Sequence, residues 1–388
     1  MAGGPERKKI SLRERLARPG PRKLLAIDGG GIRGVLSLEI LRKLETELRE
    51  ASGRPDYRLA DYFDYISGTS TGGIIAAGLA IGMSVDEILA FYEESGKQMF
   101  EKARLIERLK YQYQSEPLAQ MLKKVFGADT TLESDKIETL LLLVMRNATT
   151  DSPWPISNNP YAKYNNLAHA GCNLRLPLWQ LVRASTAAPI YFPPEVIVVE
   201  GRDFIFVDGG ITMYNNPAFQ MFLMATVDRF WCHAPSQGQG WETGPDKMLI
   251  VSIGTGTSPG ARDELTPGDM NVLFNATTIP SALMFAALNE QDFLCRVFGD
   301  CVAGNPLDSE VDTMIPSVGP HRQKLFRYAR YNAELTRGGL DALGCRDVEP
   351  KEVQQLDSVE AIPALRKVGR AAATAVKRDH LNLAVFKP

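Results

Sequence analysis

The chain has 388 residues, of which 44% are hydrophobic and 23% charged, a composition typical of a folded globular protein and not of a disordered one. Its formal net charge of −2 argues against a dedicated nucleic-acid-binding protein. The 5 cysteines are scattered and include no Cys-x-x-Cys pair, which predicts neither a disulfide framework nor a zinc site.

The charge is unevenly distributed along the chain. Residues 1–22 are rich in Lys and Arg, and we expect them to form a basic N-terminal tail that is solvated and partly disordered. A basic tail can also contact anionic lipid, and that alternative stays open. The sequence shows no apolar signal core and no run long enough to cross a membrane, so we expect a cytoplasmic protein.

The first structural element is expected at residues 24–27, a wholly apolar run typical of a strand buried on both faces of a parallel sheet. Residues 28–34, Asp-Gly-Gly-Gly-Ile-Arg-Gly, turn out of it, and 35–50 have the apolar spacing of a helix. The turn matches Gly-x-Gly-x-x-Gly, the pattern of a dinucleotide-binding loop. Exposed N–H groups at a helix N-terminus equally suit an oxyanion hole, so both interpretations remain.

Residues 68–72 read Gly-Thr-Ser-Thr-Gly, with a predicted strand before them and an apolar, small-residue run after them. This is the Gly-x-Ser-x-Gly pattern of a nucleophile elbow, in which a sharp strand-to-helix turn projects one serine. Side chains at Gly68 and Gly72 would collide across so tight a turn, and glycine tolerates strained dihedrals. The pattern therefore indicates Ser70 as a nucleophile at the positive end of a helix dipole.

The remaining elements complete an α/β pattern. Further strands are expected at 140–145, 204–207 and 248–253. Helices are expected at 84–125, at 178–188 and over most of the chain beyond 270, with 352–381 as the longest stretch. Residues 151–160 have the composition of a Pro/Asn loop. The aromatic and basic side chains of 84–125 suit a lid or membrane-facing surface, although amphipathic helices on a core are commoner.

A serine nucleophile needs a base. The sequence contains the histidines His169, His233, His321 and His380, and none lies in a pattern that indicates a catalytic role. Asp208 is the stronger candidate, because it ends an apolar strand and precedes Gly209 and Gly210. Three apolar strands thus end in glycine-rich loops, which we expect to line one edge of a parallel sheet.

With these residues identified, the chain resembles the patatin-like phospholipase family. The similar blocks are 28–34, 68–72, 184–189 with 191–193, 208–210 with 215–217, and 252–256. The resemblance implies a three-layer α/β/α fold with a mostly parallel central sheet and a helical C-terminal extension. We accordingly expect a catalytic domain over 23–260 and a mainly helical region over 261–388 that packs on it.

The resemblance also implies a chemistry. Ser70 would attack a lipid ester carbonyl, Asp208 would accept the serine proton directly or through water, and the oxyanion would be held by N–H groups of Gly29, Gly30 and Gly31. Supporting positions would be Arg33, Gly34, Gly68, Gly72, Gly209 and Gly210. No metal or cofactor is implied, and activity would not depend on calcium. The substrate would be membrane phospholipid or lysophospholipid, reached by peripheral contact at the inner face of the membrane.

Other functions remain open from the sequence. Some bacterial patatin-like enzymes that the chain resembles in length are antiphage effectors activated by cyclic oligonucleotides. Such an activator would bind within 270–388, where Arg327, Arg330 or Lys367 are candidates. A nucleotide-binding protein that uses residues 29–34 is a second alternative, and a plant-like storage hydrolase is a third. A homodimer formed through the C-terminal helices is also an open expectation.

Overall fold

The computed structural model describes residues 7, 9–99, 116–189, 191–235, 240–258 and 272–388. Within them, nine strands form a single sheet with the order β5-β6-β3-β2-β1-β7-β9-β8, and β4 pairs with β3. The strands are β1 (Arg22–Ile27), β2 (Tyr65–Thr69), β3 (Leu140–Asn147), β4 (Ser152–Ser157), β5 (Glu195–Val199), β6 (Arg202–Asp208), β7 (Met248–Ile253), β8 (Asp300–Ala303) and β9 (Arg327–Tyr331). The predicted α/β class is confirmed.

The centre of the sheet is parallel. β1 pairs in parallel with β2 and β7, β2 with β3, β7 with β9, and β9 with β8. Residues 24–27, 140–145 and 248–253 are all buried, because helices cover both faces of these strands. The strands expected at these three apolar runs are therefore confirmed, and they lie in the middle of the sheet.

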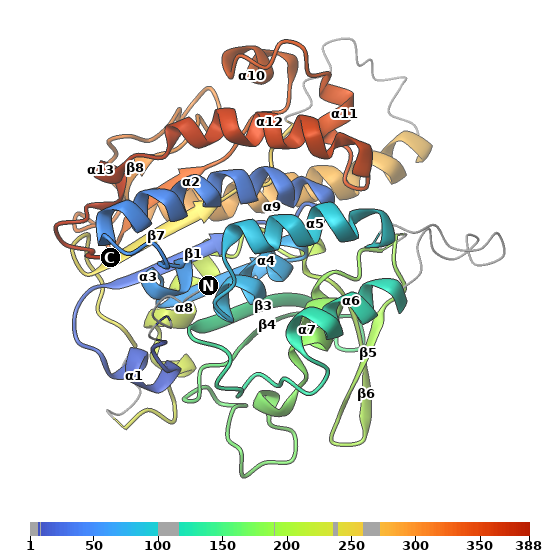
Figure 1. Ribbon diagram of the computed structural model, residues 1–388, viewed down its shortest axis with the longest axis vertical. Coiled ribbons are helices and arrows are strands. Elements are labelled where there is room, and N and C mark those ends of the chain that lie inside the picture. The colour runs from blue at the N-terminus through green and yellow to red at the C-terminus, as the bar shows by residue number, and fades with distance from the viewer. Residues whose placement is uncertain (1–6, 8, 100–115, 190, 236–239, 259–271) are drawn as a thin grey trace, which may run out of the picture.

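Helices cover the sheet in two layers (Figure 1). They are α1 (Leu12–Ala17), α2 (Gly34–Ser52), α3 (Leu59–Tyr62), α4 (Thr71–Ala80), α5 (Val85–Met99), α6 (Glu116–Phe126), α7 (Leu178–Ser185), α8 (Ala218–Thr226), α9 (Val272–Phe298), α10 (Arg337–Ala342), α11 (Pro350–Gln354), α12 (Ile362–Ala372) and α13 (Arg378–Leu381). The larger core lies under α2, α4, α7 and α12, and the smaller one lies under α8 and the end of α9. None of the helices in the described ranges is long and apolar enough to cross a membrane.

Two sequence expectations need correction. The predicted Pro/Asn loop at 151–160 contains β4, which pairs antiparallel with β3 through Pro153 and Pro155. Proline is tolerated there because, among the residues that the structure describes, β4 has no second neighbouring strand to which those residues would have to donate. The predicted helical stretch at 352–381 is broken between α11 and α12, and the longest helix in the described residues is α9.

The region expected to be mainly helical, 261–388, also contributes β8 and β9 to the sheet. The predicted helices at 84–125 appear as α5 and α6, and residues 100–115 lie outside the described residues. Residues 1–6 and 8 of the expected basic tail also lie outside them.

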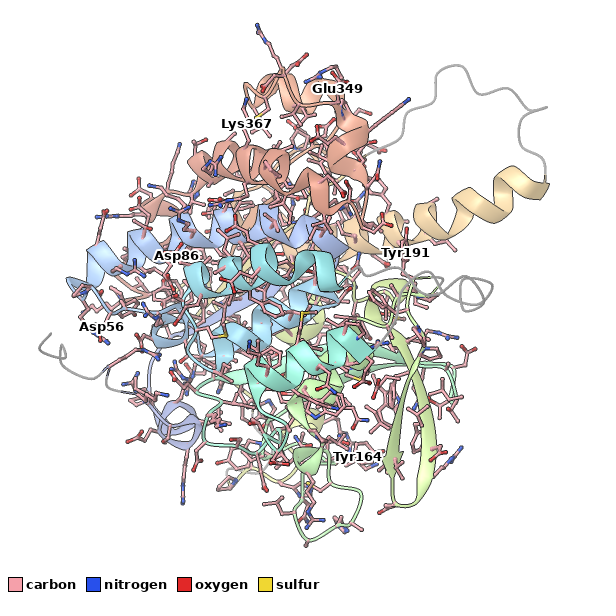
Figure 2. All side chains as sticks on the ribbon, turned by 45° about the vertical axis from the view of Figure 1, so that its right-hand side comes forward. Asp56, Asp86, Tyr164, Tyr191, Glu349 and Lys367 are labelled. Carbon is pink, nitrogen blue, oxygen red and sulfur yellow. The ribbon has the colours of Figure 1, made fainter. Side chains whose placement is uncertain are left out.

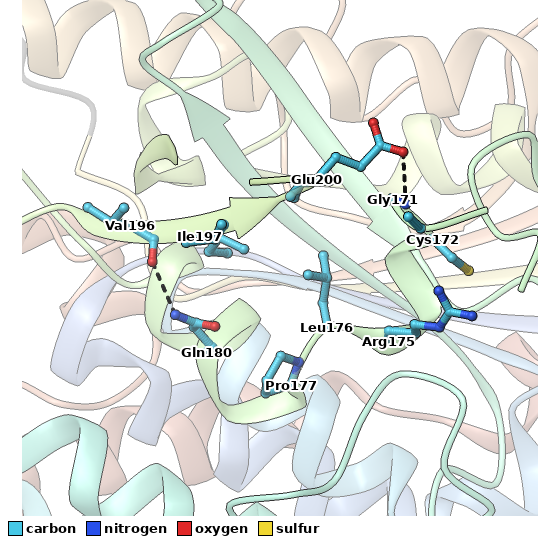
Figure 3. A pocket seen from close by; sticks show the side chains of 12 residues that line it. Gly171, Cys172, Arg175, Leu176, Pro177, Gln180, Val196, Ile197 and Glu200 are labelled. Carbon is cyan, nitrogen blue, oxygen red and sulfur yellow. Dashed lines mark hydrogen bonds between the residues drawn. The ribbon is translucent and has the colours of Figure 1, made fainter. Parts of the chain in front are cut away.

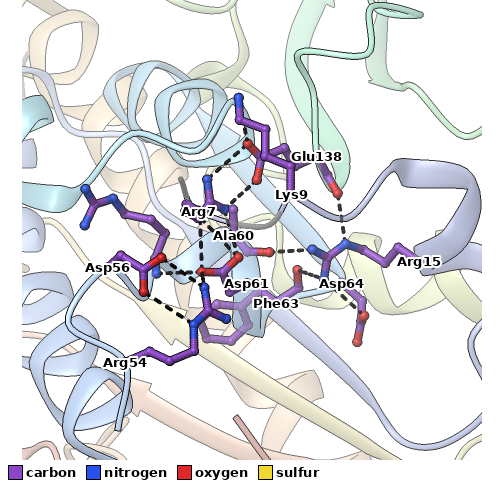
Figure 4. Close-up of polar contacts among 11 residues, drawn as sticks. Arg7, Lys9, Arg15, Arg54, Asp56, Ala60, Asp61, Phe63, Asp64 and Glu138 are labelled. Carbon is purple, nitrogen blue, oxygen red and sulfur yellow. Dashed lines mark hydrogen bonds and ion pairs between the residues drawn. The ribbon is translucent and has the colours of Figure 1, made fainter. Parts of the chain in front are cut away.

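The rest of that basic tail is not solvated as a whole. Arg15 on α1 is 1% exposed and donates to the backbone oxygens of Ala60, Phe63 and Glu138 (Figure 4). Arg7 pairs with the carboxylates of Asp61 and Glu138. The segments before β2 and β3 thus present backbone carbonyls and the carboxylates of Asp61 and Glu138 at the amino-terminal edge of the sheet, and the basic segment supplies their partners.

Candidate active site

Ser70 lies in the turn between β2 and α4, as the elbow pattern predicts. Its φ of 54° and ψ of −124° are strained for a residue with a side chain. A Cβ on Gly68 would lie 2.0 Å from the carbonyl oxygen of Gly72, and a Cβ on Gly72 would lie 2.3 Å from that of Ile27. Both positions therefore require glycine, and the turn holds Ser70 Oγ out at the start of α4.

Asp208 reaches Ser70 because β6 meets β2 end to end. β3 pairs with β4 along one side, while its other side pairs first with β2 up to Thr69 and then with β6. Val144 of β3 is opposite Thr69, and the next residue, Met145, is opposite Asp208. β6 runs antiparallel to β3, so the expectation that Asp208 ends a parallel strand is wrong, although the edge of the sheet was correctly predicted.

The two side chains are directly hydrogen-bonded. Ser70 Oγ donates to Asp208 Oδ2 at 2.6 Å, and the N–H of Gly210 donates to Asp208 Oδ1 at 2.6 Å. Burial of the carboxyl raises the pKa of Asp208 to about 6, although both hydrogen bonds oppose the shift. Asp208 is therefore mostly ionised at neutral pH and is a better proton acceptor than an ordinary aspartate.

A second serine, Ser185, supports the elbow from α7. The backbone N–H of Ser70 donates to Ser185 Oγ at 2.9 Å, and Ser185 Oγ donates to the carbonyl oxygen of Val144 at 2.6 Å. Ser185 thereby connects the backbone at Ser70 to β3. Its role was not predicted, because a lone serine in the last turn of a helix carries no sequence signal beyond the block 184–189.

The glycine-rich loop after β1 passes directly beside Ser70. The N–H of Gly29 donates to the carbonyl oxygen of Asn215 at 3.1 Å. The N–H groups of Gly30 and Gly31 have no acceptor in the described part of the protein. Of the three expected oxyanion donors, Gly29 is therefore already engaged, and Gly30 and Gly31 are available.

The same loop is closely covered on its other sides. A Cβ on Gly29 would lie 2.3 Å from Asn215 Oδ1, and one on Gly30 would lie 2.2 Å from Thr255 Oγ1. Gly31 has a φ of +59°, and its Cβ would lie 2.1 Å from the carbonyl oxygen of Leu356. A dinucleotide loop instead needs these faces open to a pyrophosphate, so the packing favours the oxyanion-hole interpretation.

A buried ion pair lies beneath the loop. Arg330 on β9 is 3% exposed, and its guanidinium donates to Asp28 Oδ1 at 2.9 Å and to Asp28 Oδ2 at 2.5 Å. It also donates to Ser252 Oγ at 2.7 Å. Arg330, expected as a candidate contact for a nucleotide activator, is thus buried against the carboxylate that precedes Gly29.

The other two activator candidates are also engaged. Arg327, three residues from Arg330 on β9, points to the opposite face of the sheet and donates to the carbonyl oxygens of Asp379 and His380. Lys367 on α12 pairs with Asp347 at the surface. No contact in the described residues brings the three basic side chains together.

Three of the expected supporting positions, Arg33, Gly34 and Gly209, lie close to neighbouring backbone or side chains. Arg33 Nε approaches the carbonyl oxygen of Gly30 at 3.4 Å, and burial lowers the pKa of Arg33 to about 10, which leaves it protonated at neutral pH. A Cβ on Gly34 would meet Thr71 Oγ1 at 2.4 Å, and one on Gly209 would meet the backbone of Val144 at 2.3 Å.

Histidine has no contact with Ser70 in the described residues, where Ser70 Oγ bonds to Asp208. His380 Nδ1 is hydrogen-bonded to the hydroxyl of Tyr331 at 2.9 Å, and His321 bonds to the backbone of Gln323. The described residues also contain no group of three or more His, Cys, Asp or Glu side chains that could hold a metal ion.

A pocket of about 310 Å³ lies elsewhere, between β5 and residues 170–180 (Figure 3). Gln180 closes one side by donating to the carbonyl oxygen of Val196, and the N–H of Gly171 bonds to Glu200 on the other. Neither Ser70 nor Asp208 lines it, so this pocket is not part of the candidate active site.

Comparisons with known proteins agree with the fold and the motifs. A family profile described as patatin-like phospholipase matches residues 25–222, just over half of the chain. Patatin-17 of Solanum cardiophyllum is 32% identical over 249 residues, covering 61% of this chain and 60% of that protein. Patatin-2-Kuras 4 of Solanum tuberosum is 32% identical over 253 residues, covering 61% and 62%. The chain thus matches about 60% of the length of these curated relatives.

Two solved structures are similar at low identity. Human GIVD cytosolic phospholipase A2 in complex with methyl gamma-linolenyl fluorophosphonate has a TM-score of 0.43 at 12% identity, over 97% of this chain and 61% of that one. VipD from Legionella pneumophila has a TM-score of 0.34 at 13% identity, over 90% and 67% of the two chains.

Proposed function

Because the chain belongs to the patatin-like phospholipase family, we propose that it is a serine lipid acyl hydrolase that cleaves ester bonds of membrane phospholipids. The observation that carries the proposal is the 2.6 Å hydrogen bond from Ser70 Oγ to Asp208 Oδ2. A strained serine, a buried carboxylate with a raised pKa and free N–H groups beside them are the parts that acyl transfer needs.

Acylation begins with transfer of the Ser70 hydroxyl proton to Asp208. Ser70 Oγ forms a bond to the ester carbonyl carbon, and the carbonyl oxygen becomes an oxyanion. The N–H groups of Gly30 and Gly31 donate to that oxyanion, and the helix dipole of α4 adds positive potential. The C–O bond to the alcohol then breaks, and protonated Asp208 gives its proton to the leaving alkoxide.

Deacylation repeats the steps with water. Asp208, again ionised, accepts a proton from a water molecule, whose oxygen attacks the acyl carbon. The bond from that carbon to Ser70 Oγ breaks, Asp208 returns the proton to Ser70, and the fatty acid leaves. No step uses histidine, a metal or a cofactor, so the proposed activity does not depend on calcium. We place it at the cytoplasmic face of a membrane, reached by peripheral contact.

Fatty-acid release from phosphatidylcholine vesicles in EDTA tests the proposal. The wild-type protein should release fatty acid, and Ser70→Ala and Asp208→Ala should not. Ser67→Ala is a matched control, because Ser67 lies three residues away and its Oγ donates only weakly, at 3.4 Å, to the backbone of Leu25. It should retain activity.

Two further arms separate the alternatives. Activity that requires an added cyclic oligonucleotide would make the protein a switched, antiphage type of hydrolase. Full activity in Ser70→Ala would contradict the proposal and would favour the alternative function, nucleotide binding at Gly29–Gly34. Size-exclusion chromatography of the same samples tests the proposed homodimer.

A further inference from the structure

Helix α9 is much longer than the part of the sheet that it covers. Its 27 residues span about 40 Å, whereas strands of five or six residues span about 20 Å. The helix leads directly into β8, so its C-terminal end lies at the amino-terminal edge of the sheet. Its first half must therefore extend past the opposite edge, and Figure 2 shows α9 projecting from the body near Tyr191.

The position of Asp292 fixes where the projecting part begins. Asp292 Oδ2 lies 3.9 Å from Arg330 Nε, and Arg330 in turn binds Asp28 at the carboxyl end of β1. Asp292 is thus close to the edge on which Ser70 lies. Leu283 is nine residues earlier, which places it about 13 Å farther along the helix axis.

The projecting part carries no charge. Residues 270–289 include no Asp, Glu, Lys or Arg. The described side chains of 282–287 are Ala-Leu-Met-Phe-Ala-Ala, all exposed or half-buried, and Leu283 is 65% exposed. Six consecutive residues turn more than once round a helix, so this stretch is apolar on every side. A helix of that kind is stable in an apolar medium and unfavourable in water.

Exposed apolar side chains also lie next to Asp208. α9 packs against the short helical turn Gly209–Ile211, which directly follows Asp208. Ile211, the last residue of that turn, is 40% exposed, and Met213, two residues later, is 46% exposed. The contact between α9 and this turn therefore brings exposed apolar side chains on both elements to the same side of the candidate active site.

We propose that residues 282–287 of α9, with Ile211 and Met213, form a docking surface that enters the interfacial layer of a lipid bilayer beside Ser70. This inference rests on the proposed function, because that function makes membrane phospholipid the substrate. Insertion of these side chains into the interfacial layer would hold the active site against the lipid.

A bilayer fits this surface better than a second copy of the chain does. One and a half turns of helix present far less area than the ~800 Å² per partner of a stable protein interface. A lipid surface needs no shape complementarity, and one exposed leucine already contributes substantially to partitioning.

Vesicle flotation tests the docking without relying on catalysis. The full-length Ser70→Ala protein should float with phosphatidylcholine/phosphatidylglycerol vesicles and remain bound at high salt, because the contact is apolar. Adding Leu283→Glu should weaken binding about tenfold or more. The matched control is Tyr164→Glu, since Tyr164 is 64% exposed and lies far from α9 in Figure 2. It should change binding less than about twofold.

Activity measurements with Ser70 intact complete the test. Leu283→Glu should lose vesicle hydrolysis by the factor by which it loses binding, and should keep its turnover of a soluble short-chain ester and its thermal midpoint. The inference is overturned if adding Leu283→Glu leaves flotation of the Ser70→Ala protein unchanged, or if the Ser70→Ala protein itself does not float. An equal loss on the soluble ester, which would make α9 part of the catalytic pocket, also overturns it.

Two other outcomes are informative. If Leu283→Glu converts a dimer into a monomer while flotation is unchanged, the surface is an interface between copies and the inference is wrong. If flotation of the Ser70→Ala protein depends on Leu283 and the wild-type protein hydrolyses no ester, the docking surface is supported and the proposed function is wrong.

Discussion

A buried arginine makes several hydrogen bonds at each edge of the sheet, and the two arginines have different roles. At the amino-terminal edge, Arg15 donates to three backbone oxygens and lies 3.5 Å from Asp64. At the carboxyl edge, Arg330 is bidentate on Asp28, directly before the glycine-rich loop. Arg15 fixes the N-terminal segment to the sheet (Figure 4), and Arg330 positions the loop that lies beside Ser70.

Hydrogen bonds from a buried arginine thus stabilise the fold at the amino-terminal edge and position the glycine-rich loop at the carboxyl edge. Asp28 and Arg330 are paired at the edge where Ser70, Asp208 and Gly30 lie, so a small displacement there would move Gly30, which we propose as an oxyanion donor. Nothing in the described cluster around Arg15 contacts those residues. Variants at the two edges should therefore separate loss of folding from loss of catalysis.

The largest effect is expected at the carboxyl edge from Asp208→Asn. The amide keeps the shape of the carboxyl but cannot accept the Ser70 proton, so kcat/KM should fall by about 10³–10⁴. Steady-state hydrolysis of a soluble ester at pH 8 measures it. Retention of more than a tenth of the activity would mean that another group is the base.

At the amino-terminal edge, Arg15→Met should lower the free energy of unfolding by about 3 kcal/mol, because it leaves buried carbonyls and Asp64 without a partner. The kcat of the folded protein should not change. Urea unfolding with initial rates on the same samples checks both quantities. A tenfold lower kcat at unchanged stability would contradict the claim that the amino-terminal edge contributes to folding and not to catalysis.

Arg330→Lys should show the opposite behaviour. Lysine keeps the charge but cannot bind Asp28 through two parallel bonds, so kcat should fall about 10- to 100-fold with little change in KM. Arg15→Lys is the matched control, because Arg15 is equally buried and makes its hydrogen bonds at the amino-terminal edge, away from the loop. It should lose comparable stability and keep its kcat.

The smallest expected effect concerns stability and pH. Burial raises the pKa of Asp208 from 3.8 to about 6, so the folded state favours the protonated carboxyl. This contribution is present below pH 3.8 and is lost as the pH rises through 6. Asp208→Asn should thus be more stable than the wild type above pH 7 by about 1–2 kcal/mol, since the buried amide also costs something. Below pH 4 the two proteins should unfold alike.

The sequence was most informative where chemistry is local. The glycines around Ser70 and the apolar strands before each loop are short-range signals; they predicted the turn at Ser70 and the α/β class, and they singled out Asp208, which is hydrogen-bonded to Ser70. The direction of β6 was not predicted, because a strand carries no mark of which way its neighbour runs. β4 was taken for a loop because its prolines suit an edge strand as well as a turn.

Contacts between distant parts of the chain could not be predicted at all. Asp28 and Arg330 are 302 residues apart, and Ser70 and Ser185 are 115 apart. Each pair forms only once the whole sheet has assembled, and neither lies in a periodic pattern. The support that Leu356 gives to Gly31 likewise arises from a break between two helices that the sequence suggested were continuous.

The most direct test of the Ser70–Asp208 pair is covalent labelling by a fluorophosphonate, followed by mass mapping of the modified peptide. The label should be on Ser70, its rate should rise with pH through a midpoint near 6, and Asp208→Asn should slow it about 10³-fold. Labelling of a different residue, or wild-type rates in Asp208→Asn, would contradict the account.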